Sequence, residues 1–423
     1  MKKKSAIAVV GTFDSKGEEH LFLKKCIENR GFRTLTINVG TARPASFIAD
    51  VDLFPLVKKD TAADLGNRDM AIQAALTRAQ QVLRERYARG EILGAISAGG
   101  GTGTHLGTGI MRVLPLGVPK VMVSTVASRN MAKTVGTKDF TMIHSVVDLL
   151  GLNSISRMIL ESAAGAVCGM VKKEVEQPHE KKRIALTFFG FVTRGAEKVK
   201  KSLEDFGYEV IPFHANGTGG MAMEELASEG YFNGILDFAT HELADRLIGG
   251  YCGGIGPKRL EPPEGQSVPR LVVPGGMDCA VLEFTRETVP DKYKHRKLFF
   301  YDFRSAIRLN QKETTLLAAE MALKLNLDPS HVKVLVPLRG FSEADRIHGP
   351  LFDPAMNDRF IKKLKKDLNP NVEVIELGYH INDAGFAKRA AQLMDGMVRT
   401  GQIPIDRDHL IERSGSKANL TAS

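Results

Sequence analysis

The sequence predicts an α/β protein with mainly parallel sheets, and two observations lead to this prediction. Short apolar runs alternate with amphipathic helical patterns along the chain, which is typical of parallel strands joined by helices on both faces of a sheet. Several apolar runs end in polar or glycine-rich loops, the place where open α/β sheets bind ligands. The 423 residues, 43% hydrophobic and 25% charged, suffice for two or three domains with large cores.

The first half of the chain has four apolar runs that we expect to be strands: Ala6–Val10, Thr34–Val39, Ile92–Ile96 and Lys120–Ser124. Helical patterns lie near Gly17–Arg30, Arg68–Ala88 and Thr104–Val113, and a long helix near His144–Met170 closes this half. A charged, proline-containing stretch at 172–183 has no hydrophobic period. We therefore place the first domain at residues 1–178.

The second half repeats the alternation. Its expected strands are Ile184–Thr187, Glu209–Phe213, Gly234–Asp237, Leu271–Val273, Val332–Val336 and Glu373–Leu377. Its expected helices are Gly195–Phe206, Ala222–Glu229, His241–Ile248, Lys312–Leu325, Pro354–Leu368 and Ala384–Val398. These elements define a second domain at residues 183–410, and residues 411–423 have the composition of a frayed tail.

The run from Ser97 to Gly107 is the strongest indication of a binding site. It has five glycines in eleven residues and follows the strand at Ile92–Ile96, so backbone N–H groups are accessible at the positive end of a helix. Phosphate or carboxylate is favoured there; a ligand-free turn, the alternative, needs only one or two glycines. The run matches neither a Walker A loop nor the dinucleotide fingerprint, and Val121–Val123 offers no acidic residue for a ribose.

Two other strand ends add groups that suit a phosphate. Thr12 and Ser15 can donate to it and Lys16 can neutralise it, while Asp14 could hold Mg²⁺ through water or cap the helix. The loop after Lys120–Ser124 adds hydroxyls and cations. The full set of predicted nucleotide-binding residues is Gly11, Thr12, Asp14, Lys16, Ser97, Gly99, Gly100, Gly101, Thr102, Gly103, Ser124, Thr125 and Arg129.

The second half contains a similar glycine-rich loop and a group of acid–base candidates. Asn216, Gly217, Thr218, Gly219 and Gly220 follow a strand and open a helix, which predicts a second anion site. The catalytic candidates at strand ends and helix starts are His214, Asp237, Glu242 and Asp278; His241 and Asp245 share one helix face. These groups could perform acid–base chemistry or hold one divalent metal, but helix caps and structurally bonded histidines are common alternatives.

Composition restricts the partners and the compartment. The net charge of +9 comes from scattered lysines and arginines, and there is no tryptophan, so we do not expect nucleic acid binding. The four cysteines are far apart and lack metal-type spacing, which favours a reducing compartment and argues against a zinc site. Neither a signal sequence nor a stretch apolar enough to span a membrane is evident, so we expect a cytoplasmic protein.

A set of motifs spread over nearly the whole chain resembles the tomato mosaic virus resistance protein family. The motifs include Gly11–Glu19, the glycine run, Ser124–Ser128, Asn216–Gly220, Pro274–Asp278 and His380–Asp383. The bacterial members of this family are uncharacterised "ATP-binding domain-containing" proteins. The resemblance implies two Rossmann-like domains, a homodimer and ATP bound by the N-terminal domain. One segment departs from the family: Tyr301, Asp302 and Phe303 lie where a His-Asn-Pro motif is usual.

Together these features predict a nucleotide-binding protein whose N-terminal loops hold the phosphates of ATP, with Mg²⁺ as a potential companion. The second domain would face a small acidic or hydroxylated metabolite, and the reaction is left open. Two alternatives stay open as well. One is an isomerase or hydrolase acting on a sugar-acid or oxo-acid; the other is an interaction protein whose dimer is stabilised by nucleotide.

Overall fold

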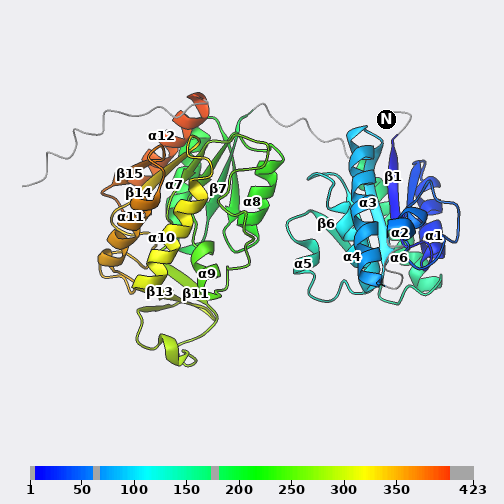
Figure 1. Ribbon diagram of the computed structural model, residues 1–423, viewed down its shortest axis with the longest axis horizontal. Helices are drawn as coiled ribbons and strands as arrows, with labels where there is room; N and C mark the ends of the chain where they lie inside the picture. The colour runs from blue at the N-terminus through cyan, green and yellow to red at the C-terminus, as the bar shows by residue number, and fades with distance from the viewer. Residues whose placement is uncertain (1–4, 61–66, 173–180, 401–423) are drawn as a thin grey trace, which may run out of the picture. The chain divides into compact units, whose positions relative to one another are not determined.

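The computed structural model describes residues 5–60, 67–172 and 181–400, and the chain divides into two compact units. Unit 1 is Met1–Gln177 and unit 2 is Pro178–Ser423. Each unit has a six-stranded parallel sheet with helices on both faces (Figure 1), which confirms the predicted α/β class and the Rossmann-like fold of both halves. The tail predicted at 411–423 lies outside the described residues.

Unit 1 has the strand order β3-β2-β1-β4-β5-β6, which is that of dinucleotide-binding Rossmann folds. All neighbouring strands are parallel. The strands are β1 (Ala6–Gly11), β2 (Thr34–Asn38), β3 (Val51–Asp52), β4 (Ile92–Gly99), β5 (Lys120–Ser124) and β6 (Phe140–His144). The helices are α1 (Gly17–Glu28), α2 (Phe54–Asp60), α3 (Arg68–Ala88), α4 (Gly101–Met111), α5 (Ala132–Val135) and α6 (Ser154–Lys172).

Alternating side chains of β1 show why this sheet is covered on both sides. Ile7 and Val9 are fully buried in a core with α1 and α6, whereas Ala8 and Val10 are buried in a second core with α2, α3 and α4. Successive strand residues point to opposite faces, so a continuously apolar strand needs helices on each face. In this sheet, α1 follows the carboxyl end of β1 and α4 follows that of β4, and these are the two central strands.

Two helix boundaries in unit 1 differ from the prediction. The expected helix His144–Met170 is wrong at its start, because Phe140–His144 forms edge strand β6 and Val146 has a positive φ of 62°. Helix α6 begins only at Ser154. Helix α4 begins at Gly101 rather than Thr104, so the glycines after Gly100 form the first helical turn instead of a loop.

Unit 2 has the strand order β15-β14-β10-β9-β7-β8, again with parallel neighbours. Its large sheet consists of β7 (Arg183–Phe188), β8 (Glu209–His214), β9 (Gly234–Asp237), β10 (Arg270–Val272), β14 (Val332–Pro337) and β15 (Glu373–Leu377). The helices are α7 (Thr193–Asp205), α8 (Gly219–Ser228), α9 (Glu242–Ile248), α10 (Gln311–Leu325), α11 (Pro354–Asp367) and α12 (Ala384–Thr400).

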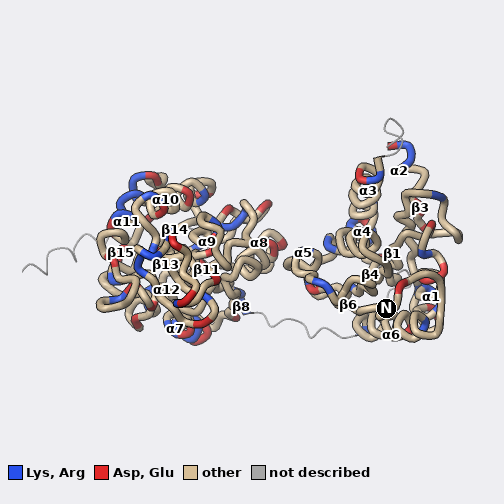
Figure 2. The backbone as a smooth tube through the Cα atoms, turned by 90° about the horizontal axis from the view of Figure 1, so that it is seen from below, with Lys and Arg blue, Asp and Glu red and all other residues tan. Residues whose placement is uncertain are grey.

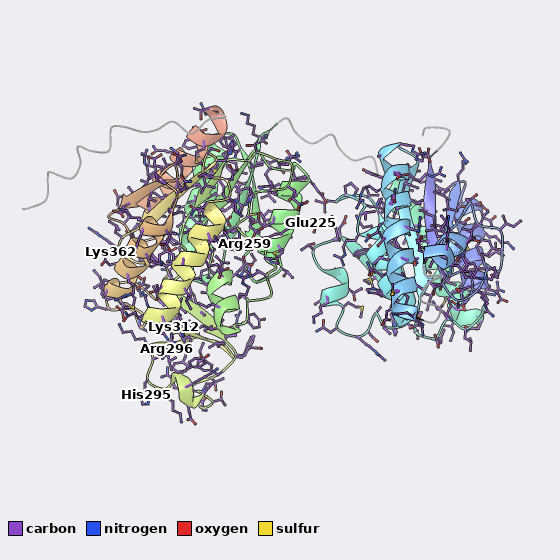
Figure 3. All side chains as sticks on the ribbon, viewed as in Figure 1. Glu225, Arg259, His295, Arg296, Lys312 and Lys362 are labelled. Carbon is purple, nitrogen blue, oxygen red and sulfur yellow. The ribbon has the colours of Figure 1, made fainter. Side chains whose placement is uncertain are left out.

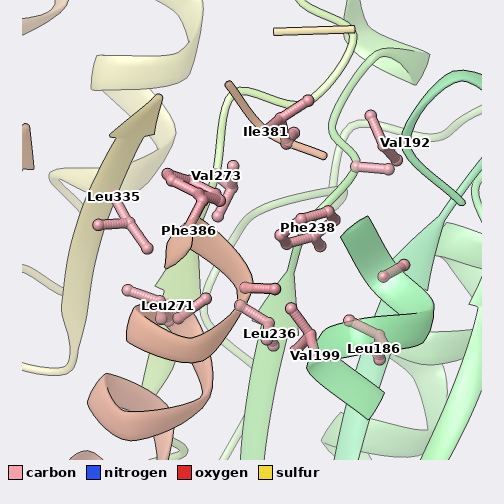
Figure 4. Close-up of a cluster of buried hydrophobic side chains, with 14 of the residues drawn as sticks. Leu186, Val192, Val199, Leu236, Phe238, Leu271, Val273, Leu335, Ile381 and Phe386 are labelled. Atoms are coloured by element: carbon pink, nitrogen blue, oxygen red, sulfur yellow. The ribbon is translucent and has the colours of Figure 1, made fainter. Parts of the chain in front are cut away.

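The largest core of unit 2 lies between the sheet and helices α7 and α12. Leu186, Leu236 and Leu271 from three neighbouring strands meet Val199 of α7 and Phe386 of α12 there (Figure 4). Helices α8, α9, α10 and α11 pack on the opposite face of the same sheet. Unit 2 is thus a second three-layer unit, and its strand order changes direction between β7 and β9.

Unit 2 also contains a small antiparallel sheet that the sequence did not predict. Its strands are β11 (Cys279–Leu282), β12 (Leu298–Phe300) and β13 (Ser305–Arg308), in the order β11-β13-β12. The segment that departs from the tomato family, Tyr301–Arg304, is the turn between β12 and β13. Strands of three or four residues are too short to show an alternating pattern, so this sheet gives little signal in a sequence.

One described helix, α6, is long and apolar enough to cross a membrane by length and composition. The expectation that no stretch is so apolar was therefore wrong. Leu160, Ala163 and Val167 of α6 are nevertheless fully buried against the sheet of unit 1. Buried helices of globular cores pass the same test, so this feature alone indicates no membrane span.

Charges of both signs lie on the outer helices of unit 2 (Figure 2). The basic run at 362–366 belongs to α11, where Lys362 pairs with Asp358 and Lys363 with Asp367. Lys365 pairs with Glu376 of β15. Acidic partners thus accompany the most basic stretch of the described chain.

Candidate functional site

A pocket of about 800 Å³ lies in unit 1 at the carboxyl ends of β1 and β4. This is the point where the strand order reverses, because the chain builds β2 and β3 on one side of β1 and then crosses to β4 on the other. Ligands of open α/β sheets bind at such a point. The volume falls within the range of about 300–1,000 Å³ that small-molecule sites occupy.

The glycine run forms one wall of the pocket. The lining residues from this run are Gly99, Gly100, Gly101, Thr102 and Gly103. Gly100 is the N-cap of α4, and no side chain caps this helix. The first N–H groups of a helix have no partner within the helix, and here the helix begins at the pocket wall. The pocket therefore adjoins the uncapped N-terminus of an eleven-residue helix, and this end of the helix carries a positive partial charge.

Gly99 and Gly101 differ in the space that a side chain would find at each position. A Cβ on Gly99 would lie 2.8 Å from the Cα of Gly103, so Gly99 is needed for the tight turn itself. A Cβ on Gly101 would meet no heavy atom within 4 Å. Gly101 is exposed, so nothing in the fold of unit 1 requires a glycine at that position.

The loop after β1 forms the opposite wall with Thr12, Asp14, Ser15 and Lys16. The Thr12 hydroxyl accepts a hydrogen bond from Ser15 Oγ at 3.1 Å. The Lys16 ammonium group donates to the carbonyl of Leu149. The groups of this loop that were predicted for a phosphate, Thr12, Ser15 and Lys16, are therefore at the pocket, and Lys16 is anchored by a backbone contact.

Asp14 is 7% exposed and does not cap the helix that follows it. Its Oδ2 accepts a hydrogen bond from the backbone N–H of Ala42 at 3.0 Å, which ties the loop after β2 to the pocket. Its Oδ1 is buried without a hydrogen-bond partner in the described chain. Of the two roles predicted for Asp14, a magnesium ligand or a helix cap, the structure does not contain the helix cap.

Gly11 lies outside the pocket, beneath the imidazole ring of His20. A Cβ on Gly11 would lie 2.0 Å from Nε2 of His20, so the glycine makes room for this ring. His20 is fully buried, with Nδ1 donating to the Lys16 carbonyl at 2.6 Å and Nε2 accepting from Ala98 N–H at 3.3 Å. Burial lowers the pKa of His20 to about 4, so the ring is neutral near pH 7.

Four other predicted residues do not line the pocket either. Ser97 is buried against Gly107, where a Cβ would lie 2.5 Å from its Oγ. Ser124 is buried and shares a hydrogen bond of 2.7 Å with Thr104. Thr125 donates its backbone N–H to the carbonyl of Gly99, and Arg129 is exposed. The loop after β5 therefore supports the base of the glycine turn.

The pocket also contains residues that the sequence did not reveal. Lys58 and Arg68 add two cations from α2 and α3. The apolar residues Phe54, Val57, Ala71, Ile72 and Leu106 form another part of the lining. Apart from Leu106 of α4, they come from α2 and α3, which are distant from the glycine run in the sequence, so no local motif connects them to it.

The strand that occupies the ribose position of a dinucleotide fold is β2, not the Val121–Val123 stretch considered from the sequence. It ends in Asn38, which is fully buried. The Asn38 carboxamide accepts N–H groups of Phe13 and Gly40, both at 3.0 Å. The acidic residue that binds a ribose hydroxyl in NAD-binding folds is therefore not at the end of β2.

In the glycine-rich loop of unit 2, the N–H groups from Asn216 to Gly219 are engaged in hydrogen bonds. The side chain of Asn216 accepts N–H groups of Thr218 and Gly219 at 3.3 and 3.2 Å. The N–H of Gly217 donates to Glu242 at 2.8 Å. A Cβ on Gly220 would lie 2.3 Å from the same carboxylate. This loop packs on an acidic side chain, so the second anion site stays a prediction with little local support.

Two of the catalytic candidates in unit 2, Asp237 and Glu242, belong to a buried ion network. Arg259, which comes from the segment between α9 and β10 (Figure 3), contacts Asp237 at 2.5 Å, Glu242 at 2.7 Å and Glu224 at 2.9 Å. Arg270 contacts Glu224 at 2.5 Å and Asp237 at 3.1 Å. All five residues are at most 5% exposed. Burial disfavours the Asp237 carboxylate, but both guanidinium groups outweigh it and hold its pKa below the usual value.

His214 and Asp278, the other two candidates, are not among the five ion-paired residues of this network. His214 is exposed at the end of β8, beside Phe188, and burial of part of its ring lowers its pKa against the opposing charge of Glu242. Asp278 is 2% exposed and accepts a hydrogen bond from Ser342 at 2.8 Å. Burial and the neighbouring Asp345 raise the pKa of Asp278 to about 7. The structure thus distributes the four catalytic candidates over three places.

Comparison with known proteins identifies the family of the chain. Residues 5–176 match the N-terminal domain, and residues 181–398 the C-terminal domain, of the Uncharacterised protein family (UPF0261). A UPF0261 protein of Clostridium tetani is 37% identical over 94% of this chain and 100% of its own length. UPF0261 protein RA0729 of Rhizobium meliloti is 35% identical over 91% of this chain and 97% of its own length.

The tomato resemblance is confirmed by the same comparison. The ToMV resistance protein Tm-1(GCR237) of Solanum lycopersicum is 31% identical over 89% of this chain. The match covers 54% of the tomato protein, so the chain spans about half of that relative. On the evidence of both domain matches and the full-length bacterial relatives, the chain belongs to the uncharacterised family UPF0261.

Proposed function

We propose that unit 1 binds a nucleotide, with ATP as the expected ligand, and that the first turn of α4 binds its phosphates. The observation that supports this most strongly is the uncapped N-terminus of α4 at the wall of an 800 Å³ pocket. Backbone N–H groups and the helix dipole favour an anion there. Within the described part of the chain no side chain caps this helix, whose N-cap is Gly100 and whose first turn is Gly101, Thr102 and Gly103.

The rest of the lining supports a nucleotide rather than a free phosphate. Lys16, Lys58 and Arg68 supply positive charge for a chain of phosphates. The apolar residues from α2, α3 and α4 suit the face of a planar base. Because β2 ends in Asn38 and not in a carboxylate that could bind a ribose hydroxyl, NAD is disfavoured as the ligand. The proposal therefore concerns a mononucleotide, and it concerns binding; hydrolysis or transfer of the phosphate is left open.

Asp14 is the residue that suits a magnesium ion accompanying the phosphates. It lines the pocket, and its Oδ1 has no partner in the described chain. Mg²⁺ usually keeps several waters and uses one or two carboxylates together with phosphate oxygens. Asp14 would contact the ion through such a water. The metabolite expected for unit 2, the homodimer and the cytoplasmic location stay predictions.

Thermal melting of the full chain with ATP, with and without Mg²⁺, tests the proposal. ATP at about 100 times its Kd stabilises unit 1 by roughly 2.7 kcal/mol, which raises its Tm by about 5–10 °C. Gly101→Val should abolish this shift, because a side chain there meets only open space and covers the donors. ADP, NAD and small carboxylates serve as competing ligands.

Gly169→Val is the matched control. Gly169 lies in α6, away from the pocket, and a Cβ there also meets no heavy atom within 4 Å. Its ATP response should equal that of the wild type. If wild-type protein shows no shift with ATP, or if Gly101→Val responds as the control does, the phosphate site is elsewhere or absent.

A further inference from the structure

Three metal-ligating side chains of different types converge in the interior of unit 2. His241 precedes α9, Asp245 lies one turn further along this helix, and Cys252 follows its end. One ligand atom of each lies within 4.8 Å of the other two. His241 is 1% exposed, Asp245 0% and Cys252 5%. The group adjoins the buried ion network, whose members Arg259 and Glu242 act electrostatically on His241 and Asp245.

The backbone after α9 explains how Cys252 reaches this position. Helix α9 ends at Gly249, whose φ of 73° turns the chain back. A Cβ on Gly250 would lie 2.8 Å from Asp245 Cγ, and a Cβ on Gly253 would lie 2.9 Å from Arg246 Cα. Glycines therefore allow the returning chain to touch the helix. The N–H of Cys252 then donates to Asp245 Oδ2 at 2.7 Å, which fixes the cysteine beside the carboxylate.

His241 supplies an independent indication of a missing partner. Both of its ring nitrogens are buried and have no hydrogen-bond partner in the described chain. Burying polar groups without partners costs free energy. The ring is fixed by stacking on Phe189, with centroids 3.7 Å apart and planes 16° apart, and Gly276 leaves space for both side chains. A neutral imidazole held rigidly beside a thiol and a carboxylate is a ready metal ligand.

We propose that His241, Asp245 and Cys252 bind one divalent transition-metal ion, with zinc as the expected species. Imidazole and thiolate ligands select zinc and related metals, whereas Mg²⁺ and Ca²⁺ prefer oxygen ligands only. The Cys252 thiol loses its proton when the metal binds, and the metal–sulfur bond replaces the S–H bond. Thiolate and carboxylate then balance the two positive charges of the ion.

The carboxylate retains capacity for a metal. Asp245 Oδ1 accepts the N–H of Val281 at 2.8 Å, and Oδ2 accepts that of Cys252. Each carboxylate oxygen has a second lone pair, so these backbone bonds orient Asp245 without exhausting it. Three protein ligands leave a fourth tetrahedral position for water or another small ligand, an arrangement typical of zinc sites that do chemistry.

The test uses the full chain, freed of metal and reconstituted with Zn²⁺ or Co²⁺ before excess ion is removed. We expect about one tightly bound zinc ion per chain by elemental analysis. The cobalt form should show sulfur-to-metal charge-transfer absorption together with the visible bands of four-coordinate cobalt. Cobalt or zinc held by surface histidines would lack the sulfur band, and that result, or zinc far below stoichiometry, would overturn the proposal.

Cys252→Ser and His241→Gln identify the ligands. Each should lower metal affinity by at least about tenfold to a hundredfold, and Cys252→Ser should remove the sulfur band. Cys279→Ser, which changes another buried cysteine of unit 2, should retain the wild-type metal affinity and the sulfur band. If a variant fails to fold, the cobalt spectrum of the wild type still decides for or against a thiolate site. Unchanged metal binding in both folded variants contradicts the assignment.

Discussion

Units 1 and 2 share a three-layer fold but treat the carboxyl ends of their central strands differently. In unit 1, a pocket of about 800 Å³ separates the loop after β1 from the glycine turn after β4. In unit 2, the region beside the end of β9 is filled by Arg259, which contacts three carboxylates and is 1% exposed. The same position in two related folds is thus a pocket in one unit and a packed ion network in the other.

The two glycine-rich loops show the same difference in their hydrogen bonds. Helix α4 begins without a side-chain cap, next to the pocket. Helix α8 also begins without a side-chain cap, but three N–H groups of the loop before it, at Asn216–Gly220, donate to the side chains of Asn216 and Glu242. A glycine-rich turn before a helix is therefore not sufficient evidence for an anion site. Whether its N–H groups have internal acceptors decides between a binding loop and a structural turn.

Breaking the network of unit 2 should have the largest effect. Arg259→Met leaves Asp237 and Glu242 buried without their main partner, which should destabilise unit 2 by about 3–5 kcal/mol. Hydrogen exchange of peptides covering β9 measures the local opening free energy. Strands of unit 1 should exchange as in the wild type.

Arg246→Met is the control for this change. Arg246 pairs with Glu320, and both side chains are partly exposed, at 34% and 23%. Losing such a pair costs at most about 1 kcal/mol. Equal, small effects of both variants on β9 would show that the network contributes no more than a surface ion pair.

Lowering the pH should destabilise unit 1 through His20. Its pKa is 6.5 when unfolded and about 4 when folded, so the unfolded state binds more protons between these values. The contribution is complete above about pH 6.5 and is lost as the pH falls toward 4; at about 1.36 kcal/mol per unit it amounts to roughly 3 kcal/mol. Urea denaturation followed by circular dichroism at several pH values measures it.

His20→Asn isolates this residue, because the amide keeps a donor near the position of Nδ1 but does not titrate. The difference in unfolding free energy between wild type and variant should change between pH 7 and pH 4 by the amount above. A difference that is constant with pH would mean that protonation of His20 is not coupled to folding.

Removing one cation from the pocket should have the smallest effect. Arg68→Gln should weaken ATP binding about tenfold, or about 1.4 kcal/mol, because a charged contact to phosphate is lost. Calorimetric titration measures the change. Arg84→Gln alters the same helix outside the pocket and should bind ATP as the wild type does. Equal affinities of both variants would remove Arg68 from the phosphate contacts.

The elements that the sequence predicted best are those with a long local pattern. Ile92–Ile96 is apolar on both faces and is a central strand, as expected. The edge strand Phe140–His144 was missed, and its last residue was predicted to start a helix, since apolar residues continue to Leu149 and the positive φ of Val146 leaves no trace in the pattern. Local periodicity records burial, whereas edges and short antiparallel strands depend on distant partners.

The same limit applies to the sites. The glycine turn was recognisable because one short segment contains all of its donors. The role of Arg259 was not, because its three partners lie on α8, β9 and α9. Cys252 was likewise counted among four cysteines that are far apart and lack metal-type spacing, although the return of the chain at Gly249 brings it to His241 and Asp245.

Hydrogen exchange of the full chain with and without ATP tests the contrast between the two units most directly. We expect slower exchange in peptides covering Gly99–Thr104 and Thr12–Lys16, and unchanged exchange at Asn216–Gly220. Protection at Asn216–Gly220, or none at Gly99–Thr104 when ATP is bound, would contradict the assignment of the nucleotide to the glycine turn of unit 1.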